Sequence, residues 1–218
     1  MRGILLTTLL LAAATPAAAQ GHDHTQSATG GHAHAMPAGW TARLDRANAN
    51  AADIMFMQMG TGFHAVTGPS AILYNPATTA TGAFTAGATF RQNKASAHPE
   101  GYGLIIGGRN LTAENQDYLY FIVRQDGKYM IKHRAGAETH TLVDWTANPA
   151  VRAVDAQGQA SNALSVMSTP THVRFAINGT QVAEFPRASG PNTDGVVGLR
   201  MNHNLDVAVT DFAVTPTR

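Results

Sequence analysis

Hydrophobic and polar residues alternate with a period of two along much of the chain, which is the pattern of half-buried β-strands. The clearest case is the stretch from Gly101 to Gly136. Residues 102–107 are apolar and flanked by glycine, while residues 118–124 and 129–134 alternate on either side of the turn Gln125-Asp126-Gly127. This stretch therefore predicts three consecutive antiparallel strands.

The turn between the second and third of these strands allows two registers. A two-residue loop at Asp126-Gly127 pairs Phe121 with Lys132 and mixes cations into the apolar face. A three-residue loop with Gly127 in the left-handed conformation pairs Phe121 with Ile131 and separates the two faces. We therefore predict the three-residue loop. The side chains that then face the core are Leu119, Phe121, Val123, Tyr129 and Ile131.

The opposite face of these two strands interleaves tyrosines with cations. Its members are Tyr118, Tyr120, Arg124, Lys128, Met130, Lys132 and Arg134. Aromatic rings and cations together favour stacking on, and hydrogen bonding to, a polar ligand. The same residues are also typical of an ordinary solvated sheet face. The pattern alone leaves both interpretations open.

Short strands separated by turn residues are predicted along the rest of the chain. Asn178-Gly179 is the strongest hairpin signal, and further reversals are predicted at Gly68-Pro69, at Asn75-Pro76 and over residues 190–195. Residues 40–50 are either a short helix or an extended entry to the domain. Because no long helix is predicted, the fold class is all-β, a sandwich or a barrel. The remaining predicted strands are residues 53–59, 63–66, 71–74, 82–91, 139–143, 163–167, 172–177, 180–185, 196–201 and 205–214.

The composition agrees with one β domain, expected over residues 40–218. The chain has 218 residues, of which 44% are hydrophobic and 13% charged, enough for one core of ordinary size. Its formal net charge of +1 gives no reason to expect nucleic acid or an anionic membrane as a partner. The chain contains no cysteine, so disulfides cannot stabilise it.

The N-terminus has the form of a bacterial secretory signal peptide. Arg2 supplies the positive charge, residues 4–14 are an apolar run too short to span a bilayer, and Ala17-Ala18-Ala19 forms a cleavage site before Gln20. We therefore expect residues 1–19 to be removed. The mature chain is then periplasmic or secreted, without a membrane span.

Residues 20–39 lack bulky apolar side chains and are predicted to form a disordered leader. The leader contains two His-x-His pairs, His22 with His24 and His32 with His34. Such a pair offers two imidazoles to Zn or Cu, although a flexible segment without supporting contacts binds weakly. The leader is therefore either a metal-handling segment or a polar linker that contains histidines.

Methionines alternate with apolar residues over residues 53–59. Met55, Met57 and Met59 are placed on one side of the predicted strand, and Ile54 and Phe56 on the other. Thioethers favour Cu(I) as a ligand, whereas methionine also fills irregular gaps in a core. The sequence leaves open whether these methionines face the core or a metal.

Three stretches resemble the concanavalin A-like lectin and glucanase superfamily. The first stretch is GYGLIIGG followed by YLYFIVRQDGKYMIKHRAG, and the second is NALSVM with THVRFAINGTQVAEF. Both are similar to the strand and turn motifs of laminin G-like and laminarinase-like domains. The third stretch, DGVVGLRMNHNLDVAVTDFAV, is similar to the closing segment of the 3-keto-disaccharide hydrolase-like branch. The resemblance covers about Thr61 to Val214 and implies a jelly-roll sandwich of two curved antiparallel sheets.

Members of this superfamily often bind glycans on the concave sheet, so the resemblance implies a ligand site there. If the site is there, the outward face of the meander offers Tyr118, Tyr120, Arg124, Lys132 and Arg134, and loop residues that could close over it are Trp145, Arg200 and Asn202. Laminarinase-type glucanases carry a Glu-x-Asp-x-x-Glu strand, and this chain has none. Cleavage by two facing carboxylates is therefore not expected.

The 3-keto-disaccharide hydrolase-like branch suggests a different chemistry. His203 stands where that branch has its closing histidine, and His203 with His98 and Glu100 is a candidate acid/base set or small metal site. The residues that flank His203 depart from the branch's pattern. Asp211 looks like the aspartate that binds a structural Ca²⁺ in many members.

Three functions follow as hypotheses. The leading one is an exported, non-catalytic module that binds a carbohydrate or a glycan-like ligand on its concave sheet. The first alternative is a 3-keto-glycoside hydrolase, and the second is periplasmic handling of Cu or Zn through the histidine-rich leader. The ligand and the oligomeric state are not predicted.

Overall fold

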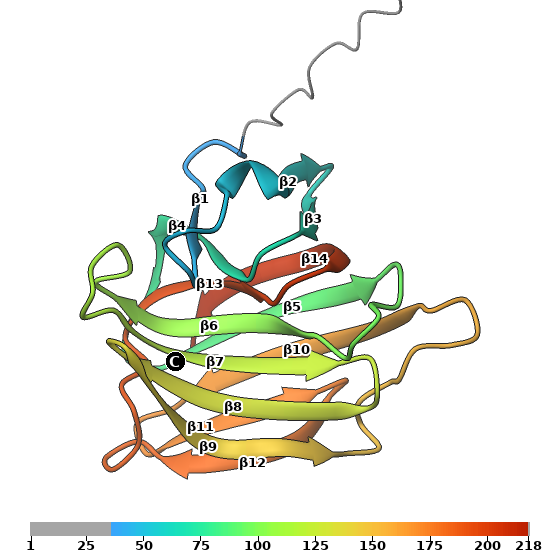
Figure 1. The fold of residues 1–218 in the computed structure, drawn as a ribbon. Coiled ribbons are helices and arrows are strands. Elements are labelled where there is room, and N and C mark those ends of the chain that lie inside the picture. Colours follow the sequence, from blue (N-terminus) through green and yellow to red (C-terminus); the bar gives the residue numbers. More distant parts are fainter. Residues whose placement is uncertain (1–35, 218) are drawn as a thin grey trace, which may run out of the picture. The chain divides into compact units, whose positions relative to one another are not determined.

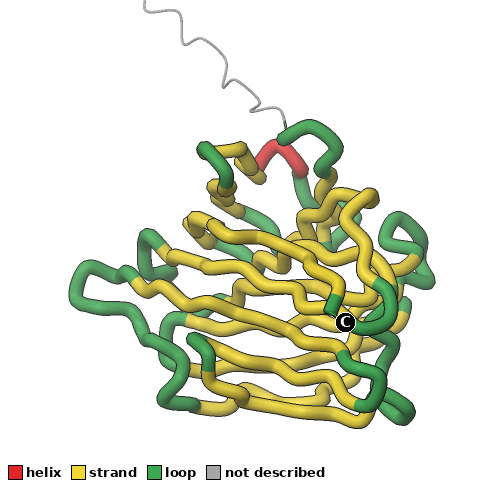
Figure 2. The backbone as a smooth tube through the Cα atoms, turned by 180° about the vertical axis from the view of Figure 1, so that it is seen from behind, coloured by secondary structure: helices red, strands yellow, loops and turns green. Residues whose placement is uncertain are grey.

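The computed structural model describes residues 36–217 as a sandwich of two antiparallel seven-stranded sheets (Figures 1 and 2). This confirms the predicted all-β jelly-roll architecture. The predicted signal peptide and the leader histidines lie outside the described residues. Among the residues that are described, no helix is long and apolar enough to cross a membrane.

Sheet A contains the meander predicted from residues 101–136. In spatial order its strands are β1 (Thr41–Leu44), β4 (Ala71–Ala80), β13 (Gly195–Met201), β6 (Gly101–Arg109), β7 (Asp117–Arg124), β8 (Lys128–Ala135) and β9 (Glu138–Ala147). Strands β6 to β9 are consecutive in both sequence and space. Strand β13 reaches this sheet from the far end of the chain and brings Arg200 next to the meander.

Sheet B packs behind sheet A. Its strands in spatial order are β12 (Thr180–Pro186), β11 (His172–Ile177), β10 (Ala160–Ser168), β5 (Phe84–Gln92), β14 (Leu205–Pro216), β3 (Gly62–Thr67) and β2 (Ile54–Met59). A 3-10 helix, η1 (Ala51–Asp53), precedes the edge strand β2. The chain crosses repeatedly between the sheets, so each sheet is assembled from segments far apart in sequence.

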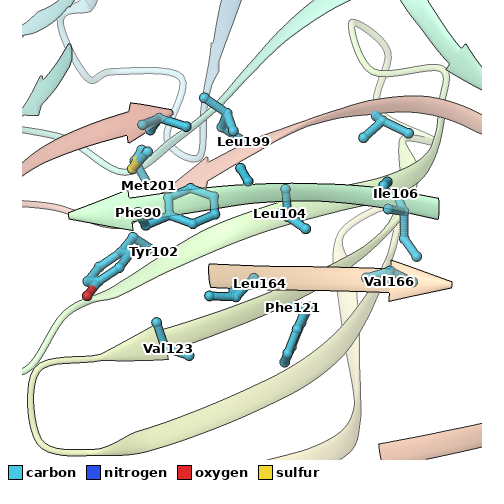
Figure 3. Close-up of a cluster of buried hydrophobic side chains, with 14 of the residues drawn as sticks. Phe90, Tyr102, Leu104, Ile106, Phe121, Val123, Leu164, Val166, Leu199 and Met201 are labelled. Carbon is cyan, nitrogen blue, oxygen red and sulfur yellow. The ribbon is translucent and has the colours of Figure 1, made fainter. Parts of the chain in front are cut away.

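The core fills the space between the sheets with alternate residues from each strand (Figure 3). The side chains that sheet A contributes include Leu104, Ile106, Phe121, Val123, Leu199 and Met201, and those from sheet B include Phe90, Leu164 and Val166. Each of them is at most 1% exposed. This burial of apolar surface is the main stabilising term of a domain that has no disulfides.

The three-residue loop predicted between β7 and β8 is confirmed. Val123 pairs with Tyr129, and Arg124 pairs with Lys128 on either side of the loop. Gly127 has a φ of 79°, a conformation that favours glycine. The register therefore follows the separation of apolar and polar residues, as the sequence predicted.

The other predicted turns have mixed outcomes. Asn178 and Gly179 have φ values of 51° and 81° and join β11 to β12 as the predicted two-residue hairpin. The reversal predicted at Asn75-Pro76 is wrong, because β4 runs through it. Tyr74 pairs with Gly198 and Thr79 with Val196, so a bulge absorbs the residues between them.

Residues 40–50 enter the domain in an extended conformation and not as a helix. Strand β1 pairs with β4 at the edge of sheet A. Just before it, the Trp40 ring packs against Phe56, Phe63 and Phe212, with ring centroids 4.6–5.6 Å away. These contacts hold the start of β1 in place, and Asp45 follows the end of that strand.

Candidate functional site

The outer face of sheet A, which carries the predicted tyrosines and cations, is largely covered. Tyr118 is 3% exposed and Tyr120 is 9% exposed. They belong to a second apolar cluster whose other buried members are Ile72, Tyr74, Ile105, Leu111, Ile122 and Met130. The expectation that both rings lie open to a ligand is therefore wrong, because they pack in a cluster with isoleucines of β4, β6 and β7 and with Leu111 of the β6–β7 loop.

An ion pair between a buried arginine and a partly exposed aspartate lies at one end of this face. Arg200 of β13 donates two hydrogen bonds to Asp45, with distances of 2.6 Å to Oδ1 and 2.5 Å to Oδ2. Arg200 is only 8% exposed, and its guanidinium lies 5.6 Å from the centroid of the Tyr120 ring. Asp45 follows β1, so the pair joins segments 155 residues apart.

The two partners keep each other charged. Burial opposes ionisation of Asp45, but the hydrogen bonds and the positive charge of Arg200 outweigh it, so the pKa of Asp45 lies below its ordinary value. Burial likewise opposes the charge of Arg200, yet Asp45 holds the pKa of that guanidinium above its usual range. The site therefore presents a fixed carboxylate and a fixed cation at neutral pH.

Asn202 extends this pair toward the surface. Arg200 Nε donates to Asn202 Oδ1 at 3.1 Å, and the backbone N–H of Asn202 donates to the carbonyl of Gly101 at 2.9 Å. These hydrogen-bonded polar groups line a pocket of about 540 Å³, a volume typical of small-molecule sites. The polar side chains that line it include Asp45, Arg46, Asn48, Arg200, Asn202 and His203.

Trp145 lies beside the same polar chain. A side chain built at Gly101 would come within 3.1 Å of the Trp145 ring and 3.4 Å of the Asn202 amide nitrogen, so both flank this glycine. The guanidinium of Arg124 lies 4.3 Å from the centroid of the Trp145 ring. Arg124 is itself held by two hydrogen bonds to Asp126, at 2.7 and 2.9 Å. The indole is thus held in place next to the pocket.

The other two predicted cations lie on the same face in β8. Lys132 pairs with Tyr120 across the strands, and Arg134 pairs with Tyr118. Arg134 Nε donates to the carbonyl of Gly136 at 2.6 Å. Both side chains are half-buried. The eight residues predicted for ligand binding therefore share one face of sheet A, but only Arg200 and Asn202 line the pocket.

The candidate acid/base residues are only partly brought together. His203 Nδ1 lies 2.7 Å from Glu100 Oε1, with the histidine side chain 53% exposed and the glutamate side chain 10% exposed. His98 is exposed, and within residues 36–217 no hydrogen bond or ion pair joins it to either of them. The structure thus places a His203–Glu100 pair at the rim of the pocket, without His98.

The metal sites predicted from the sequence stay predictions. The described part of the chain contains no group of three or more His, Asp or Glu side chains placed to hold a metal ion. Asp211 sits at a bulge of β14 with a φ of 56°, and its Oδ2 accepts a hydrogen bond from Thr210 at 3.0 Å. Calcium binding by Asp211 stays a prediction, as does metal binding by His22, His24, His32 and His34.

Two residues of this region, Asp45 and Arg43, were not predicted from the sequence. Asp45 completes the ion pair, and Arg43 donates to the carbonyls of Leu111 and Ala113, both at 2.7 Å. These contacts attach the start of the domain to the β6–β7 loop. Neither residue belongs to a recognisable motif, and their partners lie 68 or more residues away in sequence. Local pattern carries no signal for such contacts.

No model of a known protein family matches the chain, and neither does any curated protein. Solved structures do match. The carbohydrate-binding module CBM66 from Bacillus subtilis superposes with a TM-score of 0.59 at 10% identity, covering 81% of this chain and 95% of that one. A Bacillus subtilis protein of unknown function with a galectin-like fold gives 0.57 at 13% identity, covering 81% and 89%.

A third match is the β-glucanase of Bacillus licheniformis, with a TM-score of 0.56 at 10% identity over 85% of this chain and 96% of that one. At such identities the likeness concerns the fold alone. Together with the two antiparallel sheets and their strand order, it agrees with the resemblance seen in the sequence. This chain therefore has the concanavalin A-like jelly-roll sandwich fold.

Proposed function

We propose that this domain binds carbohydrate, without cleaving it, in the pocket lined by Asp45, Arg200 and Asn202. The observation that carries the proposal is the hydrogen-bonded chain from Asp45 through Arg200 to Asn202, which holds polar groups rigidly at the wall of a pocket of about 540 Å³. Similarity in fold to a carbohydrate-binding module supports the same choice of ligand.

The chemistry of the pocket matches that of a sugar. Sugar hydroxyl groups both donate and accept hydrogen bonds, and the site offers a carboxylate, a guanidinium and an amide. Trp145, held by Arg124, supplies an apolar ring beside these groups for the face of a pyranose. The site therefore combines directional polar contacts with one apolar surface, which is the usual composition of a ligand pocket.

Binding without cleavage is supported by the ion pairs that two carboxylates of this region form with arginines. Asp45 is tied to Arg200 and Asp126 to Arg124, so each already neutralises a cation. Retaining and inverting glycosidases need two carboxyl groups on either side of the scissile bond, one of them a proton donor. A carboxylate whose pKa an arginine holds low is a poor proton donor at neutral pH.

Calorimetric titration with a panel of neutral and acidic oligosaccharides tests the proposal. Asn202→Ala and Trp145→Ala are each expected to weaken binding on the order of tenfold, since central contacts typically contribute more than 1 kcal/mol. The matched control is Gln181→Ala, which removes an exposed amide from the outer face of sheet B. EDTA should leave the affinity unchanged, because the proposed contacts are made by protein side chains alone.

Two results would count against this site. If Asn202→Ala and Trp145→Ala bind the same sugars as tightly as the wild-type chain, the pocket is not the binding site. If Gln181→Ala alone loses affinity, binding belongs to the other sheet. A thermal melt of each variant separates loss of contact from loss of fold.

The His203–Glu100 pair favours a second candidate function, cleavage of 3-keto-glycosides. A glutamate 2.7 Å from a histidine can orient the imidazole ring, and a histidine oriented in this way is a typical general acid or base. Incubation of wild-type protein with 3-keto-glucosides tests it, with Glu100→Gln as the matched variant. Sugar release that Glu100→Gln abolishes supports catalysis; no release by the wild-type chain removes this candidate.

Export through the signal peptide, and metal handling by the leader, are further proposals that rest on the sequence. The mass of the mature chain recovered from the periplasm or the medium of an expressing bacterium tests the first. We expect a chain that starts at Gln20. A chain that retains residues 1–19 in the cytoplasm would contradict it.

A further inference from the structure

The edge strand β2 turns its three methionines away from the core. Ile54 is 6% exposed and Phe56 is 1% exposed, so these two residues face sheet A. Alternation then places Met55, Met57 and Met59 on the outer face of sheet B. Met59 is 57% exposed, and the other two are half-buried. Filling the core is therefore not the role of these side chains.

The adjacent strand places a histidine in the middle of this stripe. His64 of β3 pairs directly with Met57, while Met55 pairs with Val66 and Met59 with Gly62. Directly opposed residues have Cβ atoms about 5 Å apart, and diagonal neighbours about 7–8 Å. His64 is thus opposite one methionine and diagonal to the other two. Gly62 has no side chain to separate Met59 from the imidazole.

The imidazole of His64 is oriented by a carboxylate. His64 Nε2 lies 2.8 Å from Asp206 Oδ1, and the same oxygen accepts a hydrogen bond from Asn93 Nδ2 at 2.9 Å. A carboxylate that already accepts from Asn93 holds the histidine as a donor at Nε2. The lone pair of the neutral ring is then on Nδ1. Histidines that bind metals commonly have this arrangement, with one ring nitrogen donating to a carboxylate and the other free for the metal.

The donor types decide which ion fits. Thioethers and imidazole are soft or intermediate ligands and favour Cu(I), whereas Ca²⁺ and Mg²⁺ require several oxygen ligands. Among residues 36–217, the one carboxylate paired with His64 is that of Asp206, which orients its ring. Ag(I), which has the same charge and similar ligand preferences, is a redox-inert substitute for Cu(I).

We propose that Met55, Met57, Met59 and His64 form a binding site for a soft monovalent metal ion, Cu(I), on the outer face of sheet B. Asp206 positions the histidine and does not touch the ion. The site binds the ion as Cu(I), and no electron transfer is involved. It lies on the opposite sheet from the pocket of Asp45 and Arg200, so it is independent of carbohydrate binding.

Competition with bicinchoninate for Cu(I), under anaerobic conditions and with the full chain, tests this site. Changing the three methionines to leucine together keeps their volume and removes every thioether of the stripe. We expect the Cu(I) affinity to fall by more than the roughly 10–100-fold that loss of a supporting carboxylate typically costs. Asp206→Asn, which alters only the support, should fall within that 10–100-fold range.

Two matched variants identify the source of any binding. Met167→Leu removes a methionine that is 40% exposed on the same sheet but far from His64 in β10, and it should leave the affinity unchanged. Replacing the four leader histidines His22, His24, His32 and His34 by alanine should leave high-affinity Cu(I) binding intact. X-ray absorption of the loaded chain should show sulfur among the nearest neighbours of copper.

Two outcomes would overturn the site. The first is wild-type Cu(I) affinity in the chain whose three methionines are leucine, with thermal melts showing that this chain is folded. The second is an absorption spectrum with nitrogen and oxygen neighbours only, which would assign the copper to the leader. Loss of affinity in the triple variant and in His64→Ala, with Met167→Leu unaffected and sulfur in the spectrum, supports the site.

Discussion

The outer faces of the two sheets are built from the same kind of alternating strand, yet they differ in what covers them. On sheet A, Tyr118 and Tyr120 are 3% and 9% exposed and belong to a second apolar cluster. On sheet B, Met59 and Met167 are 57% and 40% exposed. A period of two therefore indicates which side chains leave the core, but not whether they reach solvent.

Segments distant in sequence make the difference. Arg43 and Asp45, at the start of the domain, contact the β6–β7 loop and Arg200, and so enclose one end of the outer face of sheet A. The outer face of sheet B has exposed pairs instead, such as Arg174 with Glu184. The pocket forms where the covering of sheet A ends, so it depends on the same contacts.

The largest expected difference between the faces concerns stability on truncation. Tyr118→Ala removes a ring that is 3% exposed, and should lower the free energy of unfolding by roughly 3–5 kcal/mol, as for other buried aromatic side chains. Met167→Ala, on the exposed face, should stay within about 0.5 kcal/mol of wild type. Urea denaturation measures both. Equal losses would show that the two faces are covered alike.

The second largest expected difference concerns the free energy of unfolding that is lost when an ion pair of each face is broken. Arg200→Met leaves Asp45 without its partner and should lower the free energy of unfolding by about 3 kcal/mol. This is the low end of the range for buried pairs, because the Asp45 side chain is 36% exposed. Arg174→Met breaks the exposed pair with Glu184 and should give no measurable change. Denaturation of both variants at low and high salt makes the comparison; a salt-sensitive loss in Arg200→Met would indicate a solvated pair.

Alkaline pH should destabilise the domain through its buried tyrosines. Burial raises the pKa of Tyr102 to about 12, and burial also raises the pKa of Tyr118 and of Tyr120. A raised pKa stabilises the fold below the ordinary value, and this stabilisation is lost as the pH rises through the folded value. For Tyr102 the loss should reach roughly 2–3 kcal/mol between pH about 10 and about 12.

Phenylalanine variants assign this alkaline loss. Tyr102→Phe should remove the alkaline loss of stability that comes from the inner face. Tyr118→Phe should remove a further loss that comes from the outer face of sheet A. Thermal melts over the alkaline range provide the measurement. If neither variant reduces the slope of stability against pH, deprotonation of these tyrosines is not what destabilises the fold.

The smallest expected effect concerns the register that decides which residues leave the core. Gly127 has a φ of 79°, so Gly127→Ala should cost about 1–2 kcal/mol from strain in the left-handed conformation, near the lower value if the loop relaxes. Cross-strand contacts between the amides around Val123 and Tyr129 should persist in NMR spectra. Their replacement by contacts in a shifted register would show that the loop, and not the apolar pattern, sets the pairing.

The fold was predictable where the signal is local. Asn178-Gly179 marks its hairpin by residue type alone, and the β7–β8 register follows from the positions of Phe121 and Ile131. The reversal predicted at Asn75-Pro76 was wrong because these residue types suit a bulge as well as a reversal. Local chemistry identifies a bend, whereas pairing with β13 on both sides of the bend decides that the strand continues.

The candidate site was predictable only in part. His203 was found through the superfamily resemblance, and Arg200, Asn202 and Glu100 were predicted as loop residues at the border of the sheet; all four lie at one end of sheet A. Asp45 was not found, since its role exists only when β1 is paired at the edge of the sheet. The covering of Tyr118 likewise depends on Leu111, which is brought there by the β6–β7 loop.

Carbohydrate binding in the pocket of Asp45 and Arg200 is tested most directly by an NMR titration of the ¹⁵N-labelled chain with the oligosaccharide that binds most tightly in calorimetry. We expect shifts in the amides of residues 45–49 and 200–204 and in the indole N–H of Trp145, with β10 to β12 unchanged. Shifts confined to β10, β11 and β12, with residues 45–49 and 200–204 unmoved, would contradict the claim that the pocket of Asp45 and Arg200 is the binding site.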